Sequence, residues 1–316
     1  MVARAMDIHT RGRFAGAPRA DALAAVSGLS PPPAHLVTEA VQAALTEDLG
    51  LAGDITTDAL IPDDHRSAAM FAARESGCVA GLALAEGAFR LVDERLAFEP
   101  LVRDGARLRP GDIIAKVSGP TAAILKGERV ALNFLCHLSG IATATSDYVA
   151  AVDGTRARIV CTRKTTPGLR AFEKYAVRAG GGHNHRFGLF DAVLIKDNHI
   201  AACGGIAPAI ERARRMLGHL VKIEIEVDTL EQLDQALAYP IDAVLLDNMS
   251  LPELTEAVAR AKIAQPQILC EASGGVRLET VRAIAETGVD LISAGSLTHS
   301  CKALDIGLDY GGAEAA

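Results

Sequence analysis

Four basic residues within the segment 162–199 have positions from which they could bind an anion. Arg163, Lys164 and Lys196 directly follow apolar, strand-like runs, and Arg186 lies in a glycine-rich loop. The segment contains seven lysines and arginines against three acidic residues, a net charge of +4 in a chain whose net charge is −7. A cation beside a buried strand needs a negative partner, and the segment offers few. The sequence therefore predicts an anion-binding site.

Three other cations of this segment, Arg170, Lys174 and Arg178, recur at helical spacing between the pair Thr166–Pro167 and Gly180. A threonine–proline pair is typical of a helix start and a glycine of a helix end. Basic residues four positions apart lie on one face of a helix. We expect that face to be solvated.

The loop 179–188 reads AGGGHNHRFG and contains His183 and His185, which would lie on one side of an extended segment. Zinc needs further ligands at suitable spacing, which the sequence does not offer, and Arg186 would repel a dication. We therefore expect His185 to donate to an anion, whereas His183 is equally well explained by a structural or solvated role. The glycines would let backbone N–H groups approach a ligand closely.

Two carboxylates, Glu226 and Asp247, close apolar runs further along the chain. Glu224 and Glu226 alternate along one strand, so both point to one side, which in a helix-covered barrel is the interior. Two interpretations remain open. These carboxylates neutralise nearby cations, or they hold Mg²⁺ through water beside a polyphosphate.

Small residues precede two later helical patterns. Ser273, Gly274 and Gly275 come before one, and Gly295 comes before the other. This arrangement suits a phosphate at a helix N-terminus. His299 lies in the second helix, where a ligand-binding role and a buried structural role are equally consistent with the sequence. The whole set predicts a site for a metal polyphosphate.

These residues are placed by a regular alternation of strands and helices after residue 155. Ligands of such proteins bind at the carboxyl ends of parallel strands, and six strand ends here carry polar residues or glycine, which favours a small barrel over an open doubly wound sheet. The strand-like runs are RARIVC, AVLI, KIEIEV, DAVLL, QILCE and DLISA. The helical patterns lie at about 167–178, 206–218, 229–238, 251–264 and 277–287.

The first half of the chain has a different character. Residues 1–34 are rich in Ala, Gly, Pro and Arg and predict a flexible extension, followed by an amphipathic helix from His35 to Gly50. Short runs over residues 66–120 are bounded by Gly, Pro and Asp and predict an α+β unit with a modest sheet. The segment 125–152 is helical in pattern and apolar on more than one face, so we expect it to be buried between domains or subunits.

Composition narrows the class of protein further. The chain has 316 residues, 49% of them hydrophobic, and its net charge of −7 argues against a nucleic-acid-binding protein. No apolar run has the length of a membrane span, and the N-terminus lacks the apolar stretch of a secretory signal. The six cysteines are scattered without a C-x-x-C pair, which is typical of reduced thiols in a cytoplasmic protein.

The order and spacing of these motifs resemble the quinolinate phosphoribosyltransferase family. The resemblance covers about residues 36–310, leaves residues 1–34 outside, and has Ala272 where the family more often has serine. It rests on TRKTTPGLRAFEKYAVRAGGGHNHRFGLFDAVLIKDNH, IEVD, LLDN, ASGGV and GVDLISAGSLTHS, with EDLGLAGDITTDALIP and GERVALNFLCHLSGIAT upstream.

The resemblance implies an α/β protein of two domains. An N-terminal α/β sandwich over residues 35–145, rejoined by residues 303–316, would pack on an incomplete TIM-like α/β barrel of fewer than eight strands over residues 146–302. The family works as a homodimer, or as a higher oligomer built from it, in which the sandwich of one subunit covers the barrel mouth of the other.

The family's site residues can be placed on this sequence by matching motifs. Arg129, in GERVALN, would reach into the active site of the partner subunit. Quinolinate would be bound by Arg163, His185, Arg186 and Lys196, and Thr162 would also contact substrate. 5-Phosphoribosyl 1-pyrophosphate would be bound by Lys164, Glu226, Asp247, Ser273, Gly274, Gly295 and His299. Among these, Lys164, Glu226 and Asp247 would be catalytic, with Mg²⁺ held by Glu226 and Asp247.

The implied reaction transfers the phosphoribosyl group to quinolinate and releases diphosphate and CO₂, giving nicotinate mononucleotide for NAD synthesis. Two alternatives remain open: a related phosphoribosyltransferase acting on another anionic acceptor, and a non-catalytic accessory protein that binds anions. Release of CO₂ from quinolinate separates the first alternative from this reaction, and release of diphosphate separates the second.

Overall fold

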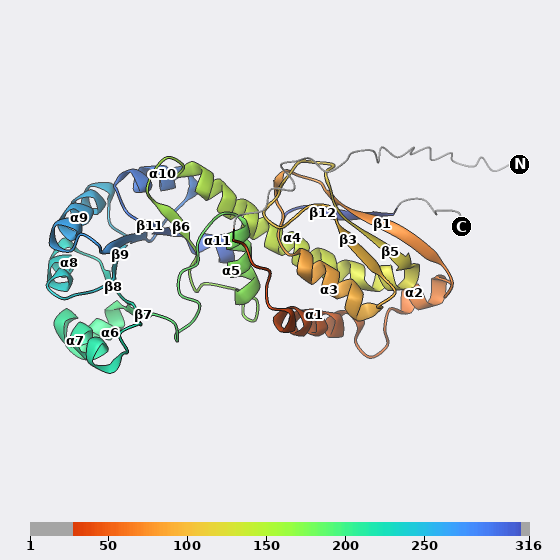
Figure 1. The fold of residues 1–316 in the computed structure, drawn as a ribbon, viewed down its shortest axis with the longest axis horizontal. Coiled ribbons are helices and arrows are strands. Elements are labelled where there is room, and N and C mark those ends of the chain that lie inside the picture. The colour runs from red at the N-terminus through yellow and green to blue at the C-terminus, as the bar shows by residue number, and fades with distance from the viewer. Residues whose placement is uncertain (1–27, 311–316) are drawn as a thin grey trace, which may run out of the picture.

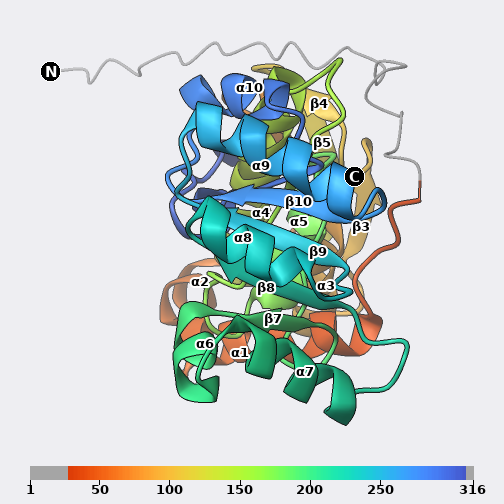
Figure 2. The same cartoon turned by 90° about the vertical axis from the view of Figure 1, so that its left-hand side faces the viewer.

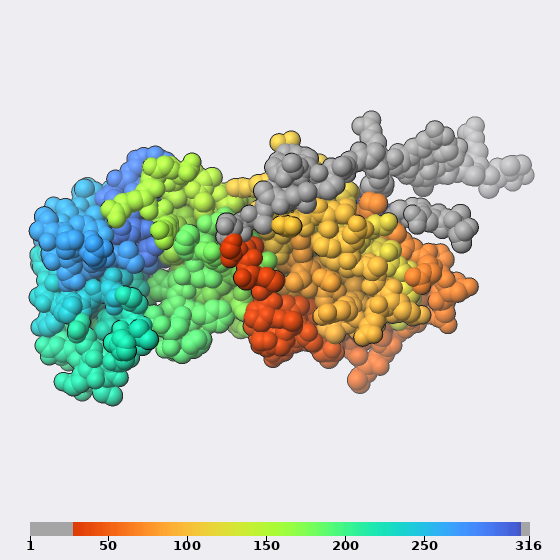
Figure 3. Space-filling model, viewed as in Figure 1, coloured from red at the N-terminus to blue at the C-terminus, as the bar shows by residue number. Residues whose placement is uncertain are grey.

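The computed structural model describes residues 28–310, which form two halves joined end to end in an elongated molecule (Figures 1 and 3). Residues 28–33 lead without regular structure into the first helix. The remainder of the predicted N-terminal extension lies outside the described residues, as do residues 311–316 of the predicted return to the sandwich.

The N-terminal half is built on a four-stranded sheet in the order β12–β1–β5–β3. The strands β1 (Arg66–Ala73) and β5 (Ile113–Pro120) form its antiparallel centre. β3 (Ala97–Pro100) pairs with β5, and β12 (Ile306–Tyr310) pairs with β1. The last strand of the chain thus completes a sheet that is otherwise made near its beginning.

Helices pack on this sheet. α1 (Ala34–Leu49) ends at Gly50, as the sequence predicts, and lies beside α3 (Leu82–Val92). Phe71 of β1 packs edge-on against Phe89 of α3, with 5.8 Å between the ring centroids, an arrangement that suits aromatic rings and joins the helices to the sheet. The smaller elements of this half are α2 (Ile55–Leu60) and a two-stranded sheet of β2 (Gly77–Cys78) and β4 (Arg107–Leu108).

The helix α4 (Thr121–Ala151) connects the two halves (Figure 1). Its 31 residues give it a length of about 46 Å. Leu135 and Ile141, on different faces of the helix, are both fully buried, as the apolar pattern predicts. A Cβ at Gly140 would overlap the carbonyl oxygen of Lys302, so glycine is required where the chain crosses the helix on its return to the sandwich.

The C-terminal half is a six-stranded parallel sheet in the order β6–β11–β10–β9–β8–β7. Helices cover its outer face (Figure 2), and the sheet curves around an interior (Figure 1). It ends at β6 and β7, so the prediction of an incomplete barrel with fewer than eight strands is confirmed. The strands are β6 (Arg158–Val160), β7 (Val193–Ile195), β8 (Ile223–Val227), β9 (Ala243–Asp247), β10 (Leu269–Ser273) and β11 (Leu291–Ser293).

The helices of this half follow the predicted pattern closely, with two differences. α5 does not begin at Thr166–Pro167, because the backbone of Gly168 is left-handed, with a φ of 81°, and interrupts the helical conformation before Arg170. A short helix, α6, directly after β7 was not predicted. The helices are α5 (Arg170–Ala179), α6 (Asp197–Cys203), α7 (Ile206–Met216), α8 (Leu230–Leu237), α9 (Leu251–Ala264), α10 (Leu278–Glu286) and α11 (Ser296–His299).

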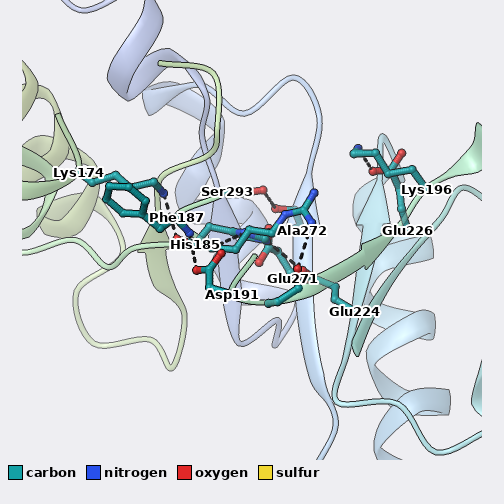
Figure 4. Close-up of polar contacts among 12 residues, drawn as sticks. Lys174, His185, Phe187, Asp191, Lys196, Glu224, Glu226, Glu271, Ala272 and Ser293 are labelled. Atoms are coloured by element: carbon teal, nitrogen blue, oxygen red, sulfur yellow. Dashed lines mark hydrogen bonds and ion pairs between the residues drawn. The ribbon is translucent and has the colours of Figure 1, made fainter. Parts of the chain in front are cut away.

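The parallel strands have two unlike faces. Outward residues such as Ile225, Leu246 and Ile292 are buried in one apolar cluster with the covering helices. Inward residues include Glu224 and Glu271, which lie close together inside the barrel (Figure 4). The apolar runs therefore reflect the outer face, while the interior carries the charged groups of the site.

Candidate active site

The carboxyl ends of four neighbouring strands bring predicted site residues to one edge of the sheet. Lys196, directly after β7, forms an ion pair with Glu226 of β8 (Figure 4). Asp247 ends β9 and lies in register with Ser273, which ends β10. The Asp247 carboxylate accepts a 2.5 Å hydrogen bond from the side-chain amide of Asn248. These strand ends carry one cationic, two anionic and one hydroxyl group in succession along one edge.

Lys164, Gly295 and His299 converge at the adjoining strand ends, β6 and β11. A Cβ at Gly295 would lie 3.1 Å from Lys164 Cδ and 3.2 Å from His299 Nε2. Thr298 Oγ1 donates to the Lys164 carbonyl at 2.7 Å. The segment after β6 and the helix α11 are thus held together, with glycine at the point of closest approach.

The loop after β10 depends on the left-handed backbone of Gly274, whose φ is 89°. A Cβ there would overlap the side chain of Asn248. The Asn248 N–H donates to the Ser273 carbonyl at 2.9 Å. The ends of β9 and β10 are therefore locked to each other by backbone and side-chain contacts.

Arg163 and Arg186 lie near each other, and neither takes part in an ion pair within residues 28–310. Burial lowers the pKa of Arg186 and the charge of Arg163 lowers it further, while the charges of Glu224 and Asp191 partly oppose this. Arg163 Nε is buried without a hydrogen-bond partner in the described chain, while Arg186 Nη1 donates to the Ala192 carbonyl at 3.1 Å. Two like charges held together in this way can receive a multiply charged anion.

His185 has both ring nitrogens engaged by the protein. Nε2 lies 2.9 Å from Glu224 and 3.7 Å from Glu271, and Nδ1 accepts the Arg186 N–H at 2.7 Å. Burial lowers the pKa of His185, but the hydrogen bond with Glu224 and the charges of both carboxylates outweigh burial and raise it. The Nδ1 contact thus holds the backbone of Arg186, while Nε2 faces the two carboxylates.

Glu271 is 1% exposed, and its Oε1 has no hydrogen-bond partner among residues 28–310. Burial and the charge of Glu224 raise the pKa of Glu271 to about 8. Ligand atoms of His185, Glu224 and Glu271 all lie within 4.8 Å of one another. The expectation that His185 has no further metal-ligating groups near it is therefore wrong, because strands distant in sequence supply two carboxylates.

A cavity of about 690 Å³ reaches this cluster from the amino-terminal ends of the strands. Lys222 and Asp242 lie at its rim, and His185, Glu224 and Glu271 line it. The cluster therefore lies between this cavity and the strand ends that carry Lys196 and Glu226.

The expectation of a solvated cationic face on α5 is wrong. Lys174 is 1% exposed, and its Nζ donates to the His185 carbonyl at 3.0 Å. Arg170 donates to the Phe187 carbonyl at 3.3 Å and Arg178 to the Gly182 carbonyl at 3.4 Å. The basic face of α5 thus binds the glycine-rich loop instead of facing water.

The other predicted residues have less distinctive positions. The hydroxyl of Thr162 accepts the Lys164 N–H at 3.1 Å. His183 forms a parallel backbone bridge with Val160, and burial lowers its pKa, which suits a structural role. Arg129 is exposed on the first half of α4, in the part that belongs to the N-terminal half. A single chain therefore does not bring Arg129 to the strand ends.

The carboxylates assigned to Mg²⁺ have suitable chemistry but unequal surroundings. Oxygen ligands from carboxylates are the ones that Mg²⁺ prefers, and Glu226 and Asp247 lie on adjacent strands. Glu226 is already paired with Lys196, whereas Asp247 is half-buried and receives the Asn248 amide. The donor set fits an ion that is bound with the help of water and substrate oxygens.

Sequence reasoning missed two residues of this region, Lys174 and Glu271. The signal for Lys174 was its helical spacing from Arg170 and Arg178. These three residues directly precede the glycine-rich loop, whose backbone carbonyl groups need donors. Glu271 gave a weaker signal, a lone acid at the end of the run QILCE and before Ala272. A charged residue within a strand that is otherwise apolar indicates a polar interior or a paired charge.

Comparison with known proteins supports the family resemblance over nearly all of the described chain. Family models described as "Quinolinate phosphoribosyl transferase, N-terminal domain" and "C-terminal domain" match residues 54–139 and 141–309. A "Probable nicotinate-nucleotide pyrophosphorylase [carboxylating]" of Bacillus subtilis is 48% identical over 263 residues, 83% of this chain and 89% of that protein. The corresponding protein of Mycobacterium leprae is 46% identical over 86% of this chain and 96% of its own length.

Solved structures agree as well. The structure of NadC from Streptococcus pyogenes superposes with a TM-score of 0.84 at 40% identity, covering 89% of this chain and 99% of that one. The nicotinate-nucleotide pyrophosphorylase from Francisella tularensis gives a TM-score of 0.83 at 37% identity, over 90% of this chain and 99% of that one. The chain belongs to the quinolinate phosphoribosyltransferase family.

Proposed function

We propose that this protein transfers the phosphoribosyl group of 5-phosphoribosyl 1-pyrophosphate to quinolinate and decarboxylates the product to nicotinate mononucleotide, in the synthesis of NAD. Membership of the family supports this activity. The observation that carries it in the structure is the pair Arg163 and Arg186, which lie close together without carboxylate partners among residues 28–310. Quinolinate has two adjacent carboxylates, which two neighbouring guanidinium groups can bind.

The phosphoribosyl donor is assigned to the neighbouring strand ends. Lys164 and His299 supply cationic or donor groups beside Gly295. Ser273 and the left-handed Gly274 supply a hydroxyl group and an accessible backbone on the far side of the same edge. Glycine at both positions leaves room for a phosphate to approach the backbone closely. Thr162, beside Lys164, is assigned a contact with substrate.

The chemistry follows from these positions. When the ring nitrogen of quinolinate attacks C1 of the ribose, positive charge develops on the sugar as diphosphate departs. Glu226 and Asp247 are the carboxylates that can stabilise this charge or hold the ribose hydroxyls. The pyridinium nitrogen of the product then accepts electrons as the 2-carboxylate leaves as CO₂. Lys164 or another donor of the mouth supplies the proton that replaces it.

Glu226 and Asp247 would also hold Mg²⁺, which when bound neutralises charge on the diphosphate. Lys196 competes for Glu226 in the structure. We therefore assign Lys196 a second role, releasing Glu226 as it turns to a substrate carboxylate.

The assay that tests this function measures CO₂ released from carboxyl-labelled quinolinate, with and without the phosphoribosyl donor and Mg²⁺. We expect release only when all three are present, together with equimolar diphosphate. A related transferase acting on a monocarboxylate would release diphosphate without CO₂. An accessory protein would release neither, and either result would refute the proposal.

We further propose a homodimer with shared active sites, itself able to form a higher oligomer. Arg129 supports this proposal, because it is exposed on α4 in the half of the molecule away from the barrel. An Arg129→Ala variant and a Lys164→Ala variant would each be inactive. Mixed in equal amounts after subunit exchange, they would recover about a quarter of wild-type activity, since half the dimers are hybrids with one intact site. No recovery after proven exchange would exclude the shared site.

The cellular location is also a proposal. All six cysteines are free thiols, which suits a reducing compartment, and we assign the protein to the cytoplasm. No helix within residues 28–310 has the length and apolar character needed to cross a bilayer. We expect neither a nucleic acid nor a membrane among the partners.

A further inference from the structure

Lys174 is a buried ammonium group that the proposed reaction does not use. It lies in the middle of α5, is 1% exposed, and is flanked by the buried residues Phe172 and Val177. Burial of an ammonium group is costly unless the charge is compensated. The contacts of this side chain therefore indicate what it does.

The two acceptors of Lys174 are a backbone carbonyl oxygen and the sulfur of a cysteine. Nζ donates to the His185 carbonyl at 3.0 Å and to Cys161 Sγ at 3.0 Å. Sγ also lies 3.4 Å from the side-chain carbonyl oxygen of Asn184. Within residues 28–310 no carboxylate lies within 4.0 Å of Lys174 Nζ.

The charge of Lys174 acts on the carboxylate of Asp191, which forms hydrogen bonds of its own. Its oxygens accept the Phe187 N–H at 2.6 Å and the Gly188 N–H at 2.9 Å. Burial raises the pKa of Asp191, but these backbone hydrogen bonds and the charge of Lys174 together lower it. Asp191 therefore shapes the loop, and the charge of Lys174 has no directly bound counter-ion.

The acceptors of Lys174 belong to the two segments that carry the arginines. Cys161 directly follows β6 and precedes Arg163 by two residues, and His185 directly precedes Arg186. The Lys174 ammonium group thus bonds to both segments that carry the arginines, behind the proposed dicarboxylate site (Figure 4 shows Lys174 beside His185).

We propose that Lys174 is a positioning residue for the dianionic substrate. It fixes the segments that carry Arg163 and Arg186 relative to each other and adds behind them a positive charge that forms no ion pair within residues 28–310. The inference rests on the proposed function of this site. Its consequence is specific: loss of Lys174 weakens binding of the pyridine dicarboxylate far more than binding of the phosphoribosyl donor.

The decisive variant is Lys174→Met, which keeps the length of the side chain and removes the charge and both hydrogen bonds. We expect the Kd of quinolinate, measured by calorimetry, to rise by about 10-fold or more, because one charge-assisted hydrogen bond contributes roughly that much. The Kd of 5-phosphoribosyl 1-pyrophosphate should change by less than about 3-fold. In kinetics the effect should fall on KM for quinolinate, and Lys174→Arg, which keeps the charge, should recover part of the affinity.

The matched control is Lys262→Met. Lys262 of α9 is likewise largely buried and donates to the Ile268 carbonyl at 2.5 Å, but it also forms an ion pair with Asp290 at 2.8 Å. Its loss should lower Tm without changing the ratio of the two dissociation constants. The control thus separates general destabilisation from the positioning role.

Equal loss of affinity for both substrates in Lys174→Met, or wild-type affinity for quinolinate, would overturn the inference. If that variant does not fold, Cys161→Ala decides, because it removes one of the two acceptors with little change in volume. It should raise the Kd of quinolinate selectively, and an unchanged Kd would again overturn the inference. Failure of the proposed function is a different result, since wild-type protein would then release no CO₂ from quinolinate.

Discussion

Two groups of cations in this site differ in whether the described chain supplies them with a negatively charged partner. At the ends of β7 and β8, Lys196 is paired with Glu226. In the segment after β6 and in the glycine-rich loop, Arg163 and Arg186 take part in no ion pair within residues 28–310, and the charge of Arg163 lowers the pKa of Arg186. The first group is neutralised within the described chain, and the second is not.

This difference indicates where each substrate binds. Repulsion between uncompensated cations is tolerated only if other contacts hold them, and here Lys174 and the loop supply those contacts. Bound dicarboxylate would supply the missing negative charge. A compensated pair such as Lys196 and Glu226 must instead rearrange when a ligand or a metal ion competes for one partner.

The largest effect should follow from removing one uncompensated arginine. We expect Arg163→Ala and Arg186→Ala each to lower kcat/KM for quinolinate by about 100-fold, the effect of a lost charge-assisted contact with a carboxylate. Because no ion pair in the described chain is lost, Tm should hold or rise. Unchanged kcat/KM in both variants, measured by CO₂ release, would contradict the assignment of the dicarboxylate site.

A smaller effect on activity, coupled to stability, should follow from Lys196→Met. We expect kcat/KM to fall by about 10-fold and the free energy of unfolding to fall by less than about 1 kcal/mol, because the lysine is partly exposed and its pair is screened. Adding Glu226→Gln should restore the stability but not the activity. If the arginine variants lose stability and the Lys196 variant does not, the contrast between the two groups is wrong.

The smallest effect on activity is expected for the interior. There the change is instead seen in how the free energy of unfolding depends on pH. The pKa of Glu271 is raised to about 8 by burial and by Glu224, opposed by His185. The folded protein therefore holds a proton that the unfolded chain loses near pH 4.5, and the free energy of unfolding falls as pH rises through this interval.

Glu271→Gln should flatten this fall by about 1.4 kcal/mol for each pH unit, between about pH 5 and pH 8, over which only the folded protein holds the proton. Urea unfolding of both proteins at the two pH values measures it. Equal slopes for wild type and variant would show that Glu271 is ionised in the folded protein across the whole range.

The parts of the fold set by local pattern could be predicted. The apolar runs identified the parallel strands, Gly50 marked the end of α1, and the polar residues after each run marked the strand ends. These features depend on periodicity and on the backbone preferences of glycine, which a single sequence contains.

The remaining features depend on contacts between distant segments. The burial of Lys174 could not be predicted, because basic residues at positions i, i+4 and i+8 have the same pattern whether the helix faces water or a loop. The cluster of His185, Glu224 and Glu271 requires three segments to meet inside the barrel. The proposed role of Arg129 depends on a second chain.

A structure of the protein with bound quinolinate tests the central claim most directly. We predict that the two carboxylates of the ligand lie within hydrogen-bond distance of the Arg163 and Arg186 guanidinium groups, with Lys174 still bound to the His185 carbonyl behind them. A ligand found in the cavity at the amino-terminal ends of the strands, or with both arginines turned to solvent, would contradict the account.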